Sequence, residues 1–268
     1  GEKQMDTKML FFDIDGTLIT EEDGKMPDST REALHLAHKR GHLLFINTGR
    51  TKKSLPKELL NMGFDGYICG WGNHIFLRGE ELLAARLSNS LCKEVAKEVR
   101  SHHVPVFYEA SDAIYMDREM PELEKWEEVA RSTFQIEGRD IEEVLASDSL
   151  VYDKLLIILK EKETRQALLE YLSRHFVCID RLHHMYEVVQ KDYSKATGIQ
   201  FICDYLGGKK ENCYVFGDSE NDRAMLEAVP NSVAMGNAEQ AVKDICSYVT
   251  TPIREDGIYR AMKHFDLI

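Results

Sequence analysis

The chain has 268 residues, which is enough for a full hydrophobic core and favours two domains over one. Hydrophobic residues make up 43% and charged residues 30% of it, as is ordinary for a globular protein in water. The formal net charge of −12 argues against nucleic-acid binding and against an anionic membrane surface, because both require clustered positive charge.

Six cysteines are scattered along the chain, without a Cys-x-x-Cys motif or Cys/His ligand spacing. Several lie in apolar runs, which is typical of small buried side chains in a reducing compartment rather than of a disulfide framework or a zinc site. No apolar run approaches membrane-spanning length, and residues 1–6 have no signal-peptide core. We therefore expect a cytoplasmic protein without a membrane partner.

The first candidate site follows a short apolar run at residues 9–12. Such a run indicates a buried parallel strand, and open α/β folds hold ligands at the carboxyl ends of these strands. Asp13 and Asp15 are two residues apart and would point the same way from extended backbone. Gly16 permits a sharp turn and Thr17 adds a hydroxyl group, so the segment is typical of an ion and phosphate site. An ordinary Asp-rich turn closed by glycine fits the same residues.

Strand and helix patterns alternate through the next part of the chain. The predicted elements are a helix over 27–41, a strand over 42–47, a helix over 52–62 and a strand over 67–69. This alternation at short intervals predicts a right-handed parallel α/β sheet.

Thr48 and Gly49 follow the second predicted strand. A hydroxyl group and an unobstructed backbone N–H at that position can meet a phosphate at the same sheet edge. A plain strand-to-helix turn also explains them.

The pattern changes near residue 84, where acidic residues no longer follow the strands. The predicted elements are helices over 89–102, 121–134 and 161–176 and strands over 104–108, 113–116, 154–159 and 177–180. No linker rich in proline or serine flanks this region, so we interpret it as an α+β domain inserted at exposed loops. The expected domains are a discontinuous core, residues 1–83 and 185–268, and an insert, residues 84–184.

Lys195 lies at the start of a predicted helix over residues 194–206. A lysine in a first helical turn is usually a solvated surface residue, and the helix dipole disfavours it there. The position is better explained if the ammonium group faces a phosphate and carboxylates.

A second acidic cluster follows a predicted buried strand over residues 213–217. Asp218 is well placed to join Asp13 on a Mg²⁺ ion, which prefers oxygen ligands in octahedral geometry. Asp222 could orient Lys195 or a metal-bound water. The cluster also fits an ordinary cap of the following helix.

The four segments occur in order, each after a predicted strand or at a helix start. These segments resemble the four motifs of the haloacid dehalogenase (HAD) superfamily: Asp13-Ile-Asp15-Gly-Thr17, Thr48-Gly-Arg50, Lys195 and Gly217-Asp218. The resemblance covers the whole chain. The chain is most similar to the Cof-like branch, which carries a large type IIB cap between the second and third motifs. It implies an α/β fold with a Rossmann-like parallel-sheet core and an inserted α+β cap domain.

The resemblance also implies the roles of the acidic residues. Asp13 would be the nucleophile and Asp15 the general acid/base. Mg²⁺ would be held by the Asp13 carboxylate, the Asp15 backbone carbonyl and Asp218. Asp222 and Thr17 would hold these groups in position without themselves binding the metal ion or the substrate.

Four further residues would hold the phosphoryl group by the same resemblance: Thr48, Gly49, Lys195 and Asn221. One segment departs from the family pattern, because residues 70–73 read Gly-Trp-Gly-Asn where relatives commonly carry an Asn-Gly-Ala-like loop. We expect this departure to alter the shape of the substrate pocket.

The expected activity is that of a Mg²⁺-dependent phosphatase that acts on small phosphorylated metabolites, with sugar phosphates as the expected class, through an aspartyl-phosphate. A sugar phosphomutase with the same core chemistry is an alternative. A catalytically silent ligand-binding or regulatory protein of the same fold is another. Retention of both Asp13 and Asp15 speaks against a silent protein, because such a protein has no chemical need for the second carboxyl group.

Overall fold

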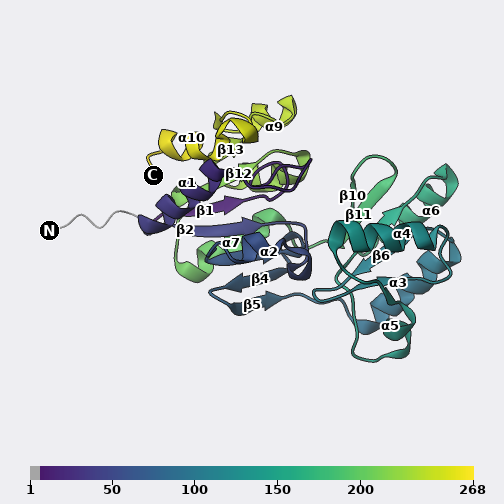
Figure 1. Ribbon diagram of the computed structural model, residues 1–268. Coiled ribbons are helices and arrows are strands. Elements are labelled where there is room, and N and C mark those ends of the chain that lie inside the picture. Colours follow the sequence, from purple (N-terminus) through teal and green to yellow (C-terminus); the bar gives the residue numbers. More distant parts are fainter. Residues whose placement is uncertain (1–6) are drawn as a thin grey trace. The chain divides into compact units, whose positions relative to one another are not determined.

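The computed structural model describes residues 7–268. Residues 1–6, on which the expected lack of a signal-peptide core falls, lie outside the described part. The chain divides into two compact units (Figure 1). Unit 1 contains the chain up to Gly49, Lys57–Leu83 and Ser194–Ile268, and unit 2 contains Arg50–Pro56 and Ala84–Tyr193. Most of unit 2 is therefore one continuous segment inserted into the sequence of unit 1.

Unit 1 is built on an eight-stranded sheet with the order β14-β13-β12-β1-β2-β3-β4-β5. The strands are β1 Met9–Phe12, β2 Leu43–Asn47, β3 Gly66–Cys69, β4 His74–Leu77, β5 Glu80–Ala84, β12 Cys213–Gly217, β13 Asn231–Ala234 and β14 Tyr248–Val249. The strands from β14 to β3 pair in parallel, and β4 pairs antiparallel with β3. The predicted parallel α/β core is confirmed.

β1 lies between β12 and β2, so the strand order reverses at β1. Open α/β sheets bind ligands in the crevice outside the carboxyl ends of strands at such a reversal. The strand order therefore supports a ligand site at the carboxyl end of β1, where the sequence predicts one.

The helices of unit 1 lie between these strands in the chain, except α10, which follows the last of them. They are α1 Asp28–Lys39, α2 Lys57–Leu60, α7 Lys195–Leu206, α8 Arg223–Ala228, α9 Gln240–Ile245 and α10 Gly257–His264. α1 packs against α10 and β2 (Figure 1). α7 packs against α8 and β3. Phe11 and Phe45, whose rings stack at 4.8 Å, belong to the same buried cluster as Ile202 of α7. This packing holds α7 against the sheet.

Unit 2 has a six-stranded sheet with the order β10-β11-β9-β6-β7-β8. Its strands are β6 Val106–Glu109, β7 Ile114–Met116, β8 Arg139–Asp140, β9 Lys154–Ile158, β10 Phe176–Asp180 and β11 Met185–Gln190, and its helices are α3 Asn89–Ser101, α4 Leu123–Val129, α5 Glu142–Ala146 and α6 Lys162–Leu172. Most strand pairs are antiparallel, as an α+β domain requires.

Two expectations about the chain course need correction. The boundary expected before residue 185 is wrong, because β11 pairs antiparallel with β9 and β10 and so belongs to the sheet of unit 2. The return to unit 1 lies between Tyr193 and Ser194. The helix expected over 52–62 is broken into a 3₁₀ turn, Lys52–Ser54, and α2. Pro56 separates the two, since proline lacks the N–H that a continuous helix would need.

Among the described residues, no helix is both long and apolar enough to cross a membrane. All six cysteines are free thiols.

The contact between α7 and β3 predicts an effect on stability. A Cβ atom at Gly198 would lie 2.4 Å from Cγ2 of Ile68. We expect Gly198→Ala to lower the free energy of unfolding by about 1 kcal/mol, because overpacking outweighs the gain of about 1 kcal/mol in helix propensity. Urea unfolding measures the change.

The matched control for Gly198→Ala is the same substitution in an Ile68→Ala background, where the clashing methyl group is gone. There it should be neutral or stabilising. Stabilisation by Gly198→Ala in the wild-type background would contradict the tight contact.

Candidate active site

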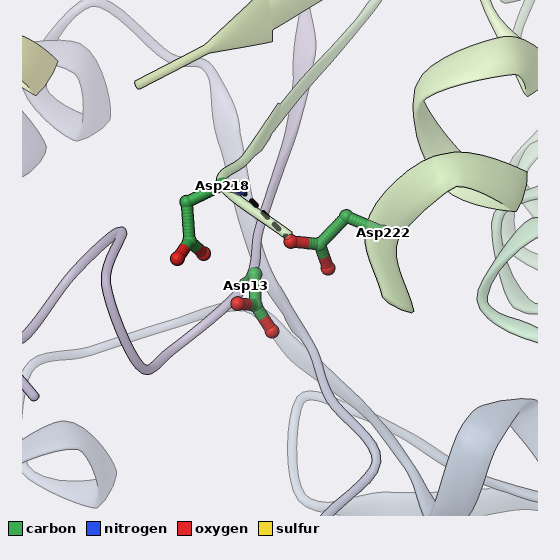
Figure 2. Close-up of side chains that lie close together, drawn as sticks. All are labelled: Asp13, Asp218 and Asp222. Carbon is green, nitrogen blue, oxygen red and sulfur yellow. Dashed lines mark hydrogen bonds between the residues drawn. The ribbon is translucent and has the colours of Figure 1, made fainter. Parts of the chain in front are cut away.

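Asp13 and Asp218 meet because their strands are neighbours. Asp13 directly follows β1, and Asp218 directly follows β12, which pairs with β1 in parallel. The backbone N–H of Asp13 donates to the carbonyl of Phe216 at 3.0 Å, which continues the strand pairing to the edge. Asp222 comes from the 3₁₀ turn Glu220–Asp222, and Figure 2 shows its carboxylate beside the other two. One oxygen from each carboxylate lies within 4.8 Å of the others.

Lys195 is buried and joins two of these carboxylates. Its Nζ donates to Oδ1 of Asp13 at 2.7 Å and to Oδ1 of Asp222 at 2.6 Å. It is the first residue of α7, and Ser194 caps the helix by accepting the N–H of Thr197 at 3.1 Å. The expectation that this lysine faces carboxylates rather than solvent is confirmed.

Both oxygens of Asp222 are occupied by protein groups. Oδ1 accepts from Lys195. Oδ2 accepts the backbone N–H of Asp218 at 2.9 Å, drawn in Figure 2, and that of Ser219 at 3.2 Å. Asp222 therefore holds the lysine and the turn after β12 in place. Of the two roles considered for it, orientation of Lys195 is the one that the geometry supports.

The segment after Asp13 turns sharply against Asp218. Asp15 is partly buried and forms an isolated bridge with Ile19. Gly16 has φ +82°, and a Cβ atom there would lie 2.1 Å from Oδ2 of Asp218, so only glycine fits. The hydroxyl group of Thr17 donates to Oδ1 of Asp218 at 3.0 Å. Thr17 thus supports Asp218, as expected.

Burial and mutual repulsion set the protonation of the acidic cluster. Burial, with repulsion from Asp222, raises the pKa of Asp13 to about 6, although Lys195 opposes the shift. Burial, with repulsion from Asp13 and Asp222, raises the pKa of Asp218 to about 9. Burial by itself lowers the pKa of Lys195, but Asp13 and Asp222 together bring it above its ordinary value. Asp13, Asp218 and Asp222 repel one another, and Lys195 is the ammonium group beside them. A further cation at this site would reduce the repulsion.

These donors fit a hard divalent cation such as Mg²⁺. Asp13 and Asp218 offer carboxylate oxygens close together, whereas Asp222 is engaged by Lys195 and backbone N–H groups. Oxygen ligands from few carboxylates are what Mg²⁺ prefers in proteins.

The residues expected to hold a phosphoryl group lie at the ends of neighbouring elements. Thr48 follows β2 and is buried, with its N–H bound to the carbonyl of Ile68 at 2.8 Å. Gly49 comes next in the chain, and Asn221 lies partly buried in the turn before α8. Thr48 and Gly49 follow β2 and Asn221 follows β12, and both strands pair with β1 in parallel, so these groups lie at the same sheet edge as Asp13.

Two asparagines that support the site were not predicted. Asn47, fully buried, donates to the carbonyl of Lys195 at 2.9 Å and so ties β2 to α7. Asn237 donates to the carbonyl of Gly16 at 3.0 Å and accepts the N–H of Ile253 at 2.9 Å. Asn47 ends the strand predicted over 42–47, and this position is the signal that could have indicated it. Asn237 follows β13, and its partners are distant in sequence, so no local signal indicates it.

The chain resembles known proteins over nearly its full length. A family model described as haloacid dehalogenase-like hydrolase matches residues 10–262. The chain is 30% identical to the 5-amino-6-(5-phospho-D-ribitylamino)uracil phosphatase YitU of Bacillus subtilis, over 97% of this chain and 99% of that protein.

Solved structures show the same likeness. The HAD subclass IIB sugar phosphatase BT4131 matches with a TM-score of 0.82 and 32% identity, over 98% of this chain and 100% of that one. The HAD phosphatase BT1666 of Bacteroides thetaiotaomicron matches with a TM-score of 0.84 and 28% identity, over 100% of this chain and 97% of that one.

The ion pair between Lys195 and Asp13 predicts a measurable pKa change. Lys195→Met should raise the pKa of Asp13 further above about 6, by at least one unit, because the neighbouring positive charge that opposes the shift is removed. Carboxyl ¹³C NMR titration of the metal-free protein measures it. Lys209→Met, at an exposed position, is the control and should leave the titration unchanged. If Asp13 has the same pKa in Lys195→Met as in the wild type, the Lys195 ammonium group does not influence the titration of Asp13.

Proposed function

Because the chain belongs to the haloacid dehalogenase-like hydrolases and is a phosphatase, we propose that it uses Mg²⁺ to hydrolyse small phosphorylated metabolites through an aspartyl-phosphate. The observation that carries the proposal is the buried Lys195 ammonium group held between Asp13 and Asp222, beside Asp218. It supports the proposal because a carboxylate that could act as the nucleophile, a positive charge and oxygens that could bind a metal lie together at one sheet edge.

In the proposed first step, a carboxylate oxygen of Asp13 attacks the phosphorus atom and the bond from phosphorus to the leaving oxygen breaks. Asp15 gives its proton to that oxygen, so a neutral alcohol departs. Lys195, the hydroxyl group of Thr48, the N–H of Gly49 and the amide of Asn221 bind the phosphoryl oxygens as charge moves onto them.

In the second step, Asp15 takes a proton from a water molecule as the water attacks phosphorus. The bond from phosphorus to Asp13 breaks, which releases inorganic phosphate and restores the Asp13 carboxylate. Bound Mg²⁺, held by Asp13, the carbonyl group of Asp15 and Asp218, would supply positive charge to the phosphoryl group. Asp222 keeps the ammonium group of Lys195 in place through both steps.

Sugar phosphates are the proposed substrate class. The relatives support this choice, because one is a sugar phosphatase and another acts on a phosphorylated ribitylamino compound. Unit 2 is proposed to be the cap domain that selects the leaving group, and a cytoplasmic location is part of the same proposal. A mutase and a silent binding protein are the outcomes that the following test distinguishes.

Phosphate release from a panel of sugar phosphates tests the activity. With Mg²⁺ we expect release that EDTA abolishes and that Asp13→Asn lowers by about 10³-fold or more, because the nucleophile is lost. Asp204→Asn, an exposed carboxylate on α7, is the matched control and should keep wild-type rates.

The products decide between the alternatives. An isomeric sugar phosphate in place of free phosphate would indicate a mutase. Folded protein that binds Mg²⁺ but transforms no substrate would favour a binding or regulatory protein. Undiminished release by Asp13→Asn would contradict the aspartyl-phosphate.

The raised pKa values predict a pH-dependent response to Mg²⁺. Without metal, the pKa of Asp13 is about 6 and that of Asp218 about 9, above the ordinary 3.8, so the folded protein holds protons that the unfolded chain releases. The contribution of Asp13 and Asp218 to the free energy of unfolding therefore falls as pH rises from about 4 through about 9. Mg²⁺ displaces the protons, so it should raise the melting temperature more at pH 8 than at pH 5.

Thermal unfolding with and without Mg²⁺ at the two pH values measures this response. Asp218→Asn should reduce the Mg²⁺-induced shift of the melting temperature at both pH values, because it removes a metal ligand and a titrating group together. Asp204→Asn should leave the shift unchanged. Equal Mg²⁺ shifts at pH 5 and pH 8 would contradict the predicted competition between the cation and protons.

A further inference from the structure

The turn Gly70–Gly72 after β3 carries a tryptophan in a backbone conformation that bulky residues rarely adopt. Trp71 has φ 60° and ψ 40°, in the left-handed region. Its N–H donates to the carbonyl of Thr48 at 3.2 Å, and its side chain is only 6% exposed. Such strained positions persist where the surroundings fix them, and they are frequent at functional sites.

The indole ring touches two groups of the proposed phosphoryl site. The Nζ atom of Lys195 lies 5.3 Å from the centroid of the Trp71 ring, within the range of a cation–π interaction. A Cβ atom at Gly49 would lie 2.5 Å from Nε1 and 2.6 Å from Cε2 of Trp71. The edge of the ring therefore fills the space that a side chain at position 49 would take.

The turn is also fixed against the start of α7. A Cβ atom at Gly72 would lie 2.1 Å from the carbonyl oxygen of Ser194, the residue that caps the helix of Lys195. A Cβ atom at Gly70 would lie 2.1 Å from Oδ1 of Asn73. The turn thus has little room to shift without moving the helix start.

We propose that Trp71 is a positioning residue that sets the separation between the Lys195 ammonium group and the Gly49 backbone. This inference rests on the proposed function, because both groups are assigned there to the phosphoryl oxygens. The ring stabilises the charged ammonium group with its face and limits the approach of the Gly49 loop with its edge. Transition-state charge then meets both donors at a fixed spacing.

The second tryptophan of the chain is a matched control. Trp126 in α4 is 8% exposed, and Nζ of Lys125 lies 4.9 Å from its ring centroid. It belongs to unit 2 and packs edge-on against Phe107. Trp126 therefore matches Trp71 in burial and in its lysine contact, but its lysine is not a residue of the proposed site.

Kinetics of three variants test the role. Trp71→Asn removes the ring and keeps a residue that tolerates the left-handed conformation, so it should lower kcat by about tenfold with a smaller change in KM. Trp71→Phe keeps a ring face and should stay within about threefold of wild type. Trp126→Phe should keep wild-type kcat. A kcat for Trp71→Asn within twofold of wild type would overturn the proposal.

A double-mutant cycle tests the contact with Gly49. Gly49→Ala should lower kcat in the wild-type background, because its Cβ atom displaces the indole ring from Lys195. In a Trp71→Asn background the same change should cost at least about fivefold less. Additive effects would show that Trp71 and Gly49 act separately, which also overturns the proposal.

Fluorescence reads the same contact without turnover. The chain has two tryptophans, so Trp126→Phe reports Trp71 alone and Trp71→Phe reports Trp126 alone. Mg²⁺ with beryllofluoride, a mimic of a phosphoryl group on aspartate, should change the emission of Trp126→Phe and leave that of Trp71→Phe unchanged. An active enzyme whose Trp71 emission does not respond would count against the proposal.

The two proposals fail in different ways. If the wild type releases no phosphate but Trp126→Phe responds to beryllofluoride, the positioning role stands and the proposed hydrolysis fails. If the wild type hydrolyses sugar phosphates and Trp71→Asn matches its kcat, the hydrolysis stands and the positioning role fails.

Discussion

The site depends on one buried ammonium group shared by two carboxylates. A buried lysine costs several kcal/mol in lost hydration unless its partners are close and well oriented. Lys195 meets this condition with Asp13 and Asp222 at hydrogen-bond distance. The partners must in turn be fixed, and the N–H groups of Asp218 and Ser219 fix Asp222. Burial, together with repulsion from Asp13 and Asp222, explains why the pKa of Asp218 is so high without metal.

The fold places this ammonium group through contacts that have no chemical role of their own. α7 must begin at the carboxyl edge of the sheet, and Ser194 ends the preceding chain there by capping the helix. Gly198, one turn later, lets the helix lie close against Ile68 of β3. Asn47 then binds the carbonyl group of Lys195 from the end of β2. Sheet order, helix packing and one buried amide together determine where a single nitrogen atom lies.

The ends of the strands carry a simple signal in the sequence, and this signal predicts which residues of the candidate site lie together. Apolar runs that stop at Asp13, Thr48 and Asp218 predict one sheet edge, and the parallel pairing of β1, β2 and β12 brings them together. β11 carries no such signal, because its residue pattern does not say which sheet it pairs with. Asn237 carries none either, because its partners at Gly16 and Ile253 are distant in sequence. Pairing partners across long separations are what local periodicity cannot reveal.

Trp71 marks the place where local preference and tertiary structure disagree most. A left-handed conformation favours glycine or asparagine, and Gly70 and Gly72 on either side satisfy that preference. Trp71 does not, so its contacts must offset the strain of this conformation, among them the hydrogen bond from its N–H to the carbonyl of Thr48 and the contacts of its ring. Those contacts include the Lys195 ammonium group and the Gly49 backbone. Violations of local rules in natural proteins concentrate where function compensates for them, and this one lies against the two groups proposed to bind the phosphoryl group.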